Sequence, residues 1–522
     1  MKASHKDILS LAVPSILANI TVPLVGMADI AVAGHLGGSS GAAAGGASAA
    51  ALIGGITIGT MLFDLLYWNF SFLRSGTGGL TAQAYGASLA DEYKNAGKTY
   101  SSPTESASQV QKVAQNVLNS HVMTGPDRAS HAAGIKAILL RALRIALISG
   151  VALIALQWVV LWLAFLFVDC SPEVRELASH YFKIRVWAAP ATLSLFAFKG
   201  WFIGLQDTVR PMIADLLVNG LNIALSFGLG FGLCGLPAMG FAGVAAGTLI
   251  AQWCGFAYAA FAARHSLDQV QQHPVDQVQA QQSTAPSEPH PVDQVQAPSF
   301  FRMNRDLVLR SLGMIAVYIG FTVISAKYGD TMLAVSSILM KLLLVFSYFT
   351  DGFAYAGEAL TGKFIGARDR EGVQSAVRGT FLWGWGLAGA FMLLYGLGGV
   401  PAFRLLTSDA SVVDAGREFI MWLLLMPIIG VPAFIWDGIF TGATETGAMR
   451  NSTLLCAVGF FAVWFGGLWL VGAVSGSAPD GPLAIHILMA AYFVHLAIRS
   501  VYLTVVRRRI LPVEAEKPVE VK

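Results

Sequence analysis

Residues 8–28 read ILSLAVPSILANITVPLVGMA, an apolar run without a charged side chain. A helix needs about 20 such residues to cross the hydrocarbon core of a bilayer. Comparable runs recur along the chain, of which 55% is hydrophobic and only 12% charged, whereas soluble domains usually carry about 25% charged residues. Because lipid offers no partner to backbone polar groups, these runs must be helical. The sequence therefore predicts an all-α polytopic membrane protein.

Twelve membrane-spanning segments are predicted from the apolar runs. They lie at roughly 7–34, 46–86, 136–168, 174–204, 210–232, 241–264, 305–326, 331–365, 371–398, 412–441, 449–471 and 482–506. Lys and Arg are concentrated in alternate loops, on the side of the N-terminus, and cytoplasmic loops carry such an excess. We therefore expect a multi-pass protein of the cell inner (plasma) membrane with both termini in the cytoplasm.

Two pairs of motifs indicate an internal repeat. LTAQAYGA at 80–87 matches LTGKFIGA at 360–367, an offset of 280 positions, and FIGLQDT at 202–208 matches FTGATET at 440–446, an offset of 238. The first half thus carries about 42 additional residues, the size of the polar segment 89–131. We interpret that segment as an insert in a cytoplasmic loop, and the two halves as six-helix lobes related by a parallel repeat.

Four regions follow from this division. We predict an N-terminal lobe at 1–265, which includes the polar insert, a linker at 266–299, a C-terminal lobe at 300–510 and a cytoplasmic tail at 511–522. The linker repeats a short unit, such as VDQVQ at 275–279, and is rich in Gln and Pro. Such a composition cannot bury a core, so we expect the linker to be disordered, and the insert to be poorly ordered.

Acidic residues inside a span are costly to bury and are therefore functional candidates. Asp29 lies near the outer end of the first span, six residues after Pro23. In a dry cavity a carboxylate keeps a proton more readily than in water, so Asp29 could bind and release a proton near neutral pH. The alternative is an aspartate at the membrane surface, solvated from outside.

The fifth and sixth spans carry polar residues at helical spacing. Asn219, Asn222 and Ser226 form one stripe on the fifth span, and Thr248 and Gln252 lie one turn apart on the sixth. Together with the carboxylate of the first span, their oxygens suit either a hard cation or a hydrogen-bond network around a protonatable acid. Alternatively, these side chains only join the helices by hydrogen bonds.

Three further acids, together with Asn219 and Gln252 of the polar stripes, are candidates for lining a substrate cavity. Asp351 and Glu358 lie seven residues apart, on one face of the eighth span, and Asp437 lies near the inner end of the tenth. Paired charges that fix helix register are the alternative for all three, and Lys199 with Asp64 is a possible buried pair of this kind.

Several functional classes lack support in the sequence. No Gly-x-x-x-x-Gly-Lys-Ser/Thr loop, zinc-type Cys/His spacing or nucleophile elbow occurs. We therefore expect no enzyme activity, catalytic residue, cofactor, structural metal or nucleic-acid partner, and an ion gradient as the energy source. The four cysteines are too few for a disulfide framework, although one bridge between Cys170 and Cys234 remains open.

The motifs together resemble the multidrug and toxic compound extrusion (MATE) transporters, in particular their DinF-like branch. The stretches that carry this resemblance are ILSLAVPSI at 8–16 with Asp29 and AGHLG at 33–37, FLR at 72–74, TAQAYG at 81–86, DGFAYA at 351–356 and DGIF at 437–440. The resemblance covers nearly the whole chain outside the insert and the linker.

The resemblance implies two six-helix lobes around a central cavity, with substrates exchanged for protons or sodium. It makes Asp29 the coupling residue, with Asn222 and Thr248 completing the site and Ser226 standing where the family pattern has an aspartate. The missing second carboxylate favours protons, although sodium at Asp29, Asn222 and Thr248 is possible. Asp437 would match an acid used in relatives whose cation site lies in the C-terminal lobe.

The leading hypothesis is a monomeric, cation-coupled antiporter that exports amphipathic or cationic drugs and toxic compounds by alternating access, in contact with membrane lipid. One alternative is a flippase for a lipid-linked precursor, which should line its cavity with several cations. The chain offers few of these in mid-membrane, namely Lys183, Arg185, Lys199 and Lys341. The other alternative is a membrane sensor that transports nothing.

Overall fold

The computed structural model describes residues 3–38, 48–99, 128–166, 168, 170–271, 297–406 and 410–510. Throughout these residues the secondary structure is helical, without a strand, which confirms the predicted all-α class. Most of the predicted insert and linker, and nearly all of the chain after Arg509, lie outside the described residues.

The helices are longer than the hydrophobic pattern alone predicts. α3 continues into the polar insert as far as Thr99, and α10 continues to Gln271, so the first residues of the predicted linker are helical rather than disordered. Leu267 supplies a reason, because it packs against a buried apolar cluster between α3, α5, α8 and α10.

Twelve segments of the described chain are long and apolar enough to cross a membrane, and each predicted span overlaps one of them. The helices that form the first six are α1 (His5–Gly38), α2 (Ala49–Asn69), α3 (Phe72–Thr99), α5 (Arg128–Ala155), α7 (Pro172–Arg185), α8 (Ala189–Gly204), α9 (Val209–Phe231) and α10 (Phe241–Gln271), and the short α6 (Gln157–Ala164) follows the third segment. The helices of the last six are α11 (Ala297–Ser325), α12 (Asp330–Gly366), α13 (Arg370–Leu406), α14 (Ala410–Gly416), α15 (Ile420–Gly442), α16 (Thr446–Ser475) and α17 (Gly481–Val506).

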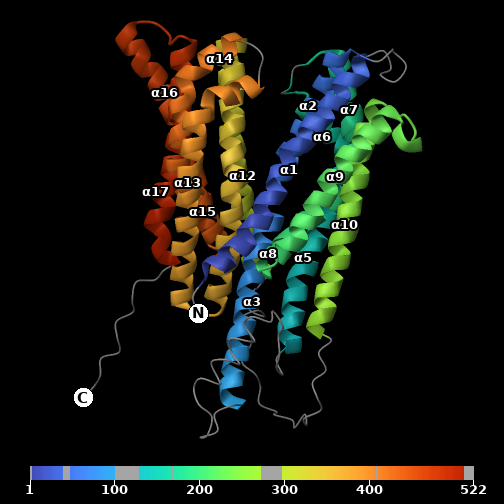
Figure 1. The fold of residues 1–522 in the computed structure, drawn as a ribbon, viewed down its shortest axis with the longest axis vertical. Helices are drawn as coiled ribbons and strands as arrows, with labels where there is room; N and C mark the ends of the chain where they lie inside the picture. The colour runs from blue at the N-terminus through green and yellow to red at the C-terminus, as the bar shows by residue number, and fades with distance from the viewer. Residues whose placement is uncertain are drawn as a thin grey trace. The chain divides into compact units, whose positions relative to one another are not determined.

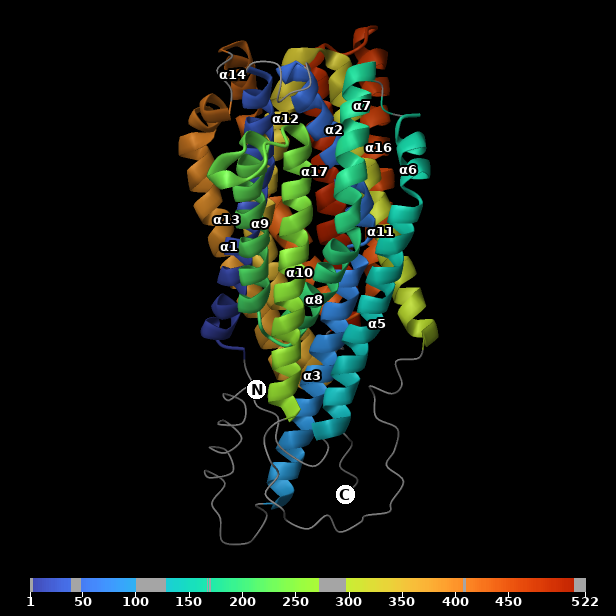
Figure 2. The ribbon, with the colours of Figure 1, turned by 90° about the vertical axis from the view of Figure 1, so that its right-hand side faces the viewer.

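The chain divides into two compact units. The N-terminal unit comprises Leu17–Phe300 with Gly366–Arg368, and the C-terminal unit comprises Met1–Ile16, Phe301–Ile365 and Asp369–Lys522. In the N-terminal unit α3 packs beside α8 and α5, and α9 beside α10 (Figure 2). In the C-terminal unit α13 packs beside α15, and α16 beside α17 (Figure 1).

The first residues of α1 group with the C-terminal unit, although the sequence places them in the N-terminal lobe. Their packing explains this difference. Gly352 of α12 lies against the backbone of Ala12, Gly379 of α13 lies against the side chain of Ile8, and the Trp383 ring Nε1 is 3.1 Å from His5 Nδ1.

The long second span is broken between α2 and α3 at Phe70, whose amide bonds back to the carbonyl of Tyr67 and closes a tight last turn. The sequence predicts a kink farther on, around Gly76, Gly78 and Gly79. These glycines lie inside the continuous α3, and the space that they leave is used for packing.

The N-terminal unit shows this packing between α3 and α8. Gly200 of α8 lies against the backbone carbonyl of Arg74, and Gly204, one turn later, lies against the backbones of Gly78 and Ala82. A side chain at either position of α8 would collide with main-chain atoms. Small residues therefore set the distance between these two helices, as is usual within membranes.

The C-terminal unit repeats the arrangement between α12 and α15. Gly438 lies against the backbone carbonyl of Ala354, and Gly442 lies against the backbones of Glu358 and Gly362. These positions follow their N-terminal counterparts by the same offsets of 280 and 238 positions that the sequence motifs show. The internal repeat is thus present in the contacts as well as in the sequence.

The turns that follow α8 and α15 are also equivalent. Gln206 and Thr444 both adopt left-handed backbone conformations, with φ of 66° and 59°. In each turn the next amide, of Asp207 or Glu445, bonds to the phenylalanine carbonyl five residues earlier. The four cysteines are free, so the bridge between Cys170 and Cys234 is not formed.

Candidate functional site

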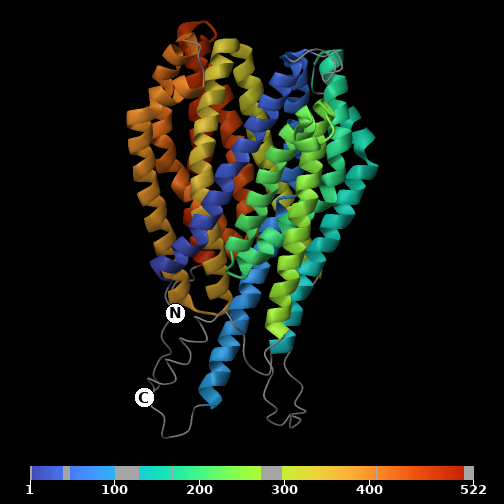
Figure 3. The ribbon, with the colours of Figure 1, turned by 45° about the vertical axis from the view of Figure 1, so that its right-hand side comes forward.

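Asp29 occupies a buried position on α1 beside α9 and α10, with 4% of its surface exposed. The two neighbouring helices form a close pair (Figure 3). Gly243 and Gly247, one turn apart on α10, lie directly against the backbone of α9. This close approach brings Thr248 of α10 to Asn222 of α9.

Hydrogen bonds connect the four residues that the sequence assigns to a coupling site. Ser226 Oγ donates to Asp29 Oδ1 at 2.9 Å and lies 3.4 Å from Asn222 Oδ1. Asn222 Nδ2 donates to Thr248 Oγ1 at 2.8 Å. All four residues are buried. The structure therefore brings together side chains from three helices that are up to 219 positions apart in the sequence.

The chemistry of this cluster follows from its single carboxylate. A buried ionised carboxylate is costly unless a positive charge or hydrogen-bond donors compensate it, and the donor from Ser226 is a neutral hydroxyl. The cluster can lower this cost by taking up a proton or a cation. Its oxygens, from one carboxylate, one amide and two hydroxyls, are of the type that hard cations bind.

The two other residues of the predicted polar stripes lie one turn away along α9 and α10. Asn219 Nδ2 donates to Thr21 Oγ1 at 2.6 Å, so this side chain ties α9 to α1. Gln252 follows Thr248 by one turn on α10 and is half-buried. Asn219 thus has a structural contact on the same two helices as the coupling cluster.

Arg185, at the end of α7, adds a positive charge to this region of the N-terminal unit. Its Nη1 donates to the Tyr181 hydroxyl at 3.1 Å and lies 3.4 Å from Thr60 Oγ1 of α2. Its charge acts on Asp29 and on Asp64. The sequence analysis counts this arginine only among the mid-membrane cations and assigns it no partner.

A second cation of the N-terminal unit, Lys199 of α8, lies 2.6 Å from Asp215 of α9. From the sequence, Asp64 is a possible partner of Lys199, and nothing in the sequence indicates Asp215. The Lys199–Asp215 pair joins two consecutive helices, α8 and α9.

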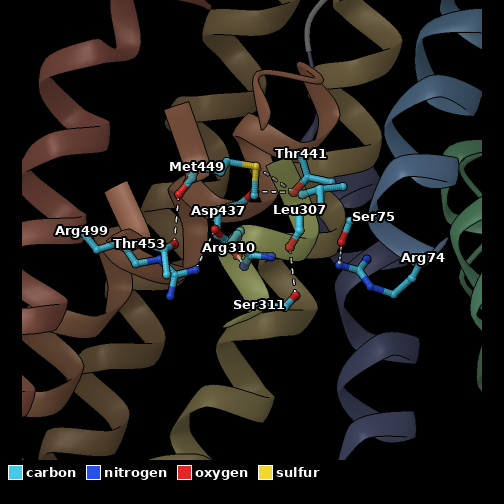
Figure 4. A network of polar contacts seen from close by, with 10 residues as sticks. All are labelled: Arg74, Ser75, Leu307, Arg310, Ser311, Asp437, Thr441, Met449, Thr453 and Arg499. Carbon is cyan, nitrogen blue, oxygen red and sulfur yellow. Dashed lines mark hydrogen bonds and ion pairs between the residues drawn. The ribbon is translucent and has the colours of Figure 1, made fainter. Parts of the chain in front are cut away.

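In the C-terminal unit, Asp437 is the centre of an ion cluster (Figure 4). The carboxylate of this residue on α15 contacts Arg310 of α11 through Oδ2, and Arg499 of α17 through Oδ1 at 2.7 Å. The side chains of Arg310, Asp437 and Arg499 are 10%, 20% and 3% exposed. One acid thus joins three helices and offsets part of the charge of two arginines.

The other two predicted cavity residues lie on α12. The charge of Asp351, which is half-buried, acts on Arg499, so this acid belongs to the electrostatic surroundings of the ion cluster. Glu358 is fully buried, and its backbone packs against Gly442 of α15. This contact is one of the repeated glycine contacts between α12 and α15.

Arg310 and Arg499 are not among the residues predicted from the sequence, and Arg185 is predicted only as a mid-membrane cation. Arg185, Arg310 and Arg499 all lie in or beside apolar runs, and the rule that singles out intramembrane acids applies equally to bases. Applied to both signs of charge, that rule would have found them. It would not have found their partners, because Arg310, Asp437 and Arg499 are brought together only by the folding of three helices.

Twelve apolar segments among the described residues, an internal repeat and buried ionisable clusters together are typical of polytopic membrane transport proteins. The MatE family model matches residues 129–227 and 307–464. The chain is also 30% identical to DNA damage-inducible protein F of Escherichia coli K12, over 98% of this chain and 93% of that relative. It belongs to the MATE family of transporters, as the motifs predict.

More distant relatives agree with this assignment. A probable multidrug resistance protein NorM of Thermotoga maritima is 22% identical over 64% of this chain and 68% of its own length. A MOP superfamily transporter from Pyrococcus furiosus superposes with a TM-score of 0.69, covering 97% of this chain and 96% of that one, at 17% identity. The structural likeness shows that the fold is shared.

Proposed function

We propose that this chain is a proton-coupled antiporter that exports amphipathic or cationic small molecules by alternating access. In this proposal it works as a monomer in the cell inner membrane, with both termini in the cytoplasm. Asp29 is the proton carrier, and Asn222, Ser226 and Thr248 form its hydrogen-bond environment. The names of the NorM relatives, which describe multidrug resistance proteins, support the substrate class.

The observation that carries the proposal is the neutral hydrogen bond from Ser226 to Asp29. A hydroxyl that points its hydrogen at the carboxylate stabilises the ionised form but leaves the negative charge in place. A proton removes that charge. A sodium ion is held best where several negatively charged oxygens converge, and here Ser226 supplies a neutral hydroxyl, so Asp29 is the one carboxylate among the four residues of the cluster. The geometry therefore favours protons over sodium.

Coupling follows from the change in hydrogen bonding when the proton binds. Ionised Asp29 accepts a hydrogen from Ser226 and so holds α1 against α9. Protonated Asp29 is a weaker acceptor, which lowers the free energy needed to separate these two helices. Because a ligand shifts an equilibrium by its differential affinity for the two states, the proton then favours the conformation in which α1 is released. A cationic substrate is bound better by the ionised form.

Ion pairs within the two units count against the flippase alternative. Three cations that an anionic lipid head could use are already engaged with acids, Lys199 with Asp215, and Arg310 and Arg499 with Asp437. A phosphate would have to displace these carboxylates. Export of neutral or cationic amphiphiles requires no such displacement.

The test is efflux of a fluorescent lipophilic cation from proteoliposomes under an imposed pH or sodium gradient. We expect the wild-type protein to respond to the pH gradient, and Asp29→Asn to fold normally but lose this response, since asparagine resembles the protonated acid permanently. Asp215→Asn, which removes a charge from the same unit, serves as the matched control and should keep the dependence. Undiminished pH-driven export by Asp29→Asn would place the proton carrier elsewhere, and no flux by the wild type would favour a sensor.

A further inference from the structure

Asp29 lies directly below an apolar layer of the N-terminal unit. Val32 of α1, Ile56 of α2, Tyr181 of α7 and Val244 of α10 belong to one cluster of buried side chains. Consecutive spans alternate in direction, so α1 runs opposite to α2, α7 and α10. A residue one turn before Val32 on α1 therefore lies at the same membrane depth as residues one turn after the cluster members on α2, α7 and α10.

At that depth the side chains are polar. Asp29 precedes Val32 by three residues, and Thr60, Arg185 and Thr248 each follow their apolar neighbour by four, so each lies one turn along the same helix face. The hydrogen bonds agree with this layer, because Arg185 Nη1 reaches Thr60 Oγ1, and Thr248 Oγ1 accepts from Asn222. Arg185 thus belongs to the same polar layer as the coupling cluster.

The guanidinium of Arg185 is held from several sides. It donates to the Tyr181 hydroxyl at 3.1 Å, and it lies 4.8 Å from the centre of the Phe63 ring and 5.7 Å from that of the Tyr181 ring. Arginine over aromatic rings is stabilised by their negative faces. These contacts keep a permanent positive charge within the layer, whatever the state of the acids around it.

Two acids and two phenols face this charge. Asp29 of α1, Asp64 and Tyr67 of α2, and Tyr181 of α7 all interact electrostatically with Arg185. Asp29 is 4% exposed, whereas the side chain of Asp64 is exposed. On the neighbouring α9, Asp215 is paired with Lys199. Because charges on buried groups are screened little, removal of Arg185 should be felt at Asp29.

We propose that Arg185 is a positioning residue that sets the pH at which Asp29 exchanges its proton. The inference rests on the proposed role of Asp29 as the proton carrier. With Asp29 ionised, the guanidinium stabilises the carboxylate, so the proton is released at a lower pH than the buried site alone would allow. When Asp29 is protonated, Asp64 is the acid that still offsets the positive charge of Arg185.

The experiment compares the pH dependence of efflux in Arg185→Gln, Arg185→Lys and the wild type. Loss of the positive charge makes the carboxylate less favourable, so Arg185→Gln should move the midpoint to higher pH by about one unit or more, the usual effect of a neighbouring arginine on an aspartate. Arg185→Lys keeps the charge and should restore most of the shift. Lys183→Gln removes a cation from the same helix, one that lies 4.5 Å over the Trp158 ring, and should leave the midpoint unchanged.

A second measurement needs no transport. The carbonyl stretch of protonated Asp29 is followed by infrared difference spectroscopy of the purified protein over a pH series, with Asp29→Asn identifying the band. Tyr181→Phe, which removes one anchor of the guanidinium and no charge, should shift the band midpoint in the same direction by a smaller amount. This variant keeps the test open if Arg185→Gln fails to fold.

The outcomes separate the two proposals. A band midpoint in Arg185→Gln or Tyr181→Phe that equals the Lys183→Gln value would overturn the role of Arg185, even if Asp29 proves to be the carrier. A band that shifts as expected, together with pH-driven export that survives in Asp29→Asn, would instead support the electrostatic link and reject Asp29 as the carrier.

Discussion

Asp29 in the N-terminal unit and Asp437 in the C-terminal unit are acids on membrane-spanning helices, but their surroundings differ. Asp29 accepts a hydrogen bond from the neutral Ser226, while Asp437 contacts the cations Arg310 and Arg499. An acid between two guanidiniums keeps its charge, because losing it would leave two positive charges uncompensated. An acid beside a hydroxyl can give up its charge. On the proposed function, this difference separates an acid that exchanges protons from one that joins helices.

The internal repeat supports this reading of Asp437. By the offset of 238 positions, Asp437 corresponds to Lys199, and both residues directly precede a glycine that packs against the neighbouring helix. Lys199 also forms an ion pair, at 2.6 Å from Asp215. The equivalent positions in the two units thus both carry a charged, ion-paired side chain, positive at Lys199 and negative at Asp437. A role that tolerates either sign is better explained by joining helices than by binding a cation.

The largest expected difference between the two acids is in stability. Asp437→Asn leaves Arg310 and Arg499 without their carboxylate and should cost about 3 kcal/mol or more, the usual effect of removing one member of a buried ion pair. Asp29→Asn replaces an acid by an amide beside a hydroxyl and should change stability little. The measurement is the thermal midpoint of the detergent-solubilised variants.

A double variant shows whether charge is the cause. Asp437→Asn combined with Arg499→Gln removes one positive charge as well, so part of the lost stability should return. Equal thermal midpoints for Asp437→Asn and Asp29→Asn would remove the distinction drawn between the two acids.

The sequence was sufficient for the parts of this comparison that depend on local patterns. Apolar runs predict all twelve spans, and helical spacing predicts that Asn222 and Ser226 share a face, as the structure has them. That Asp29 and Thr248 join them came from the family resemblance. The spacing of residues along one helix does not show which face of another helix packs against that helix.

What the sequence could not give depends on contacts between helices distant in the chain. The ion cluster joins residues on α11, α15 and α17, and nothing in their spacing indicates that Asp437 lies between two arginines. The break at Phe70 was missed for a related reason. A glycine such as Gly78 indicates either a bend in its helix or a close contact with another helix. Which of the two applies depends on α8, which packs against Gly78 and is not adjacent to it in the sequence.

The ion preference of the N-terminal cluster is the next expected difference. Ser226→Asp gives Asp29 a second carboxylate on α9, so the cluster would carry up to two negative charges and lose the hydroxyl donor. We expect export driven by a sodium gradient to increase relative to export driven by a pH gradient, because two carboxylates suit a hard cation better than one. Asn219→Asp, which introduces a carboxylate about two turns before position 226 on the same helix, is the matched control. An unchanged ratio of the two activities in Ser226→Asp would show that position 226 does not select the ion.

The smallest expected effect comes from removing the Ser226 hydroxyl alone. Ser226→Ala keeps the packing of α9 but takes away the hydrogen bond of 2.9 Å to Asp29. A hydrogen bond to the charged form stabilises that form, so its loss favours the protonated acid, and the midpoint of the pH dependence of efflux should rise. At the lower end of its usual range, a hydrogen bond to a charged group contributes about 1.5 kcal/mol, which corresponds to about one pH unit. Asp437 has no hydroxyl donor of this kind among its described contacts, and Thr441→Val, one turn from it on α15, should leave the midpoint unchanged. A fall in the midpoint of Ser226→Ala would mean that the hydroxyl stabilises the protonated acid, by accepting its hydrogen rather than donating its own.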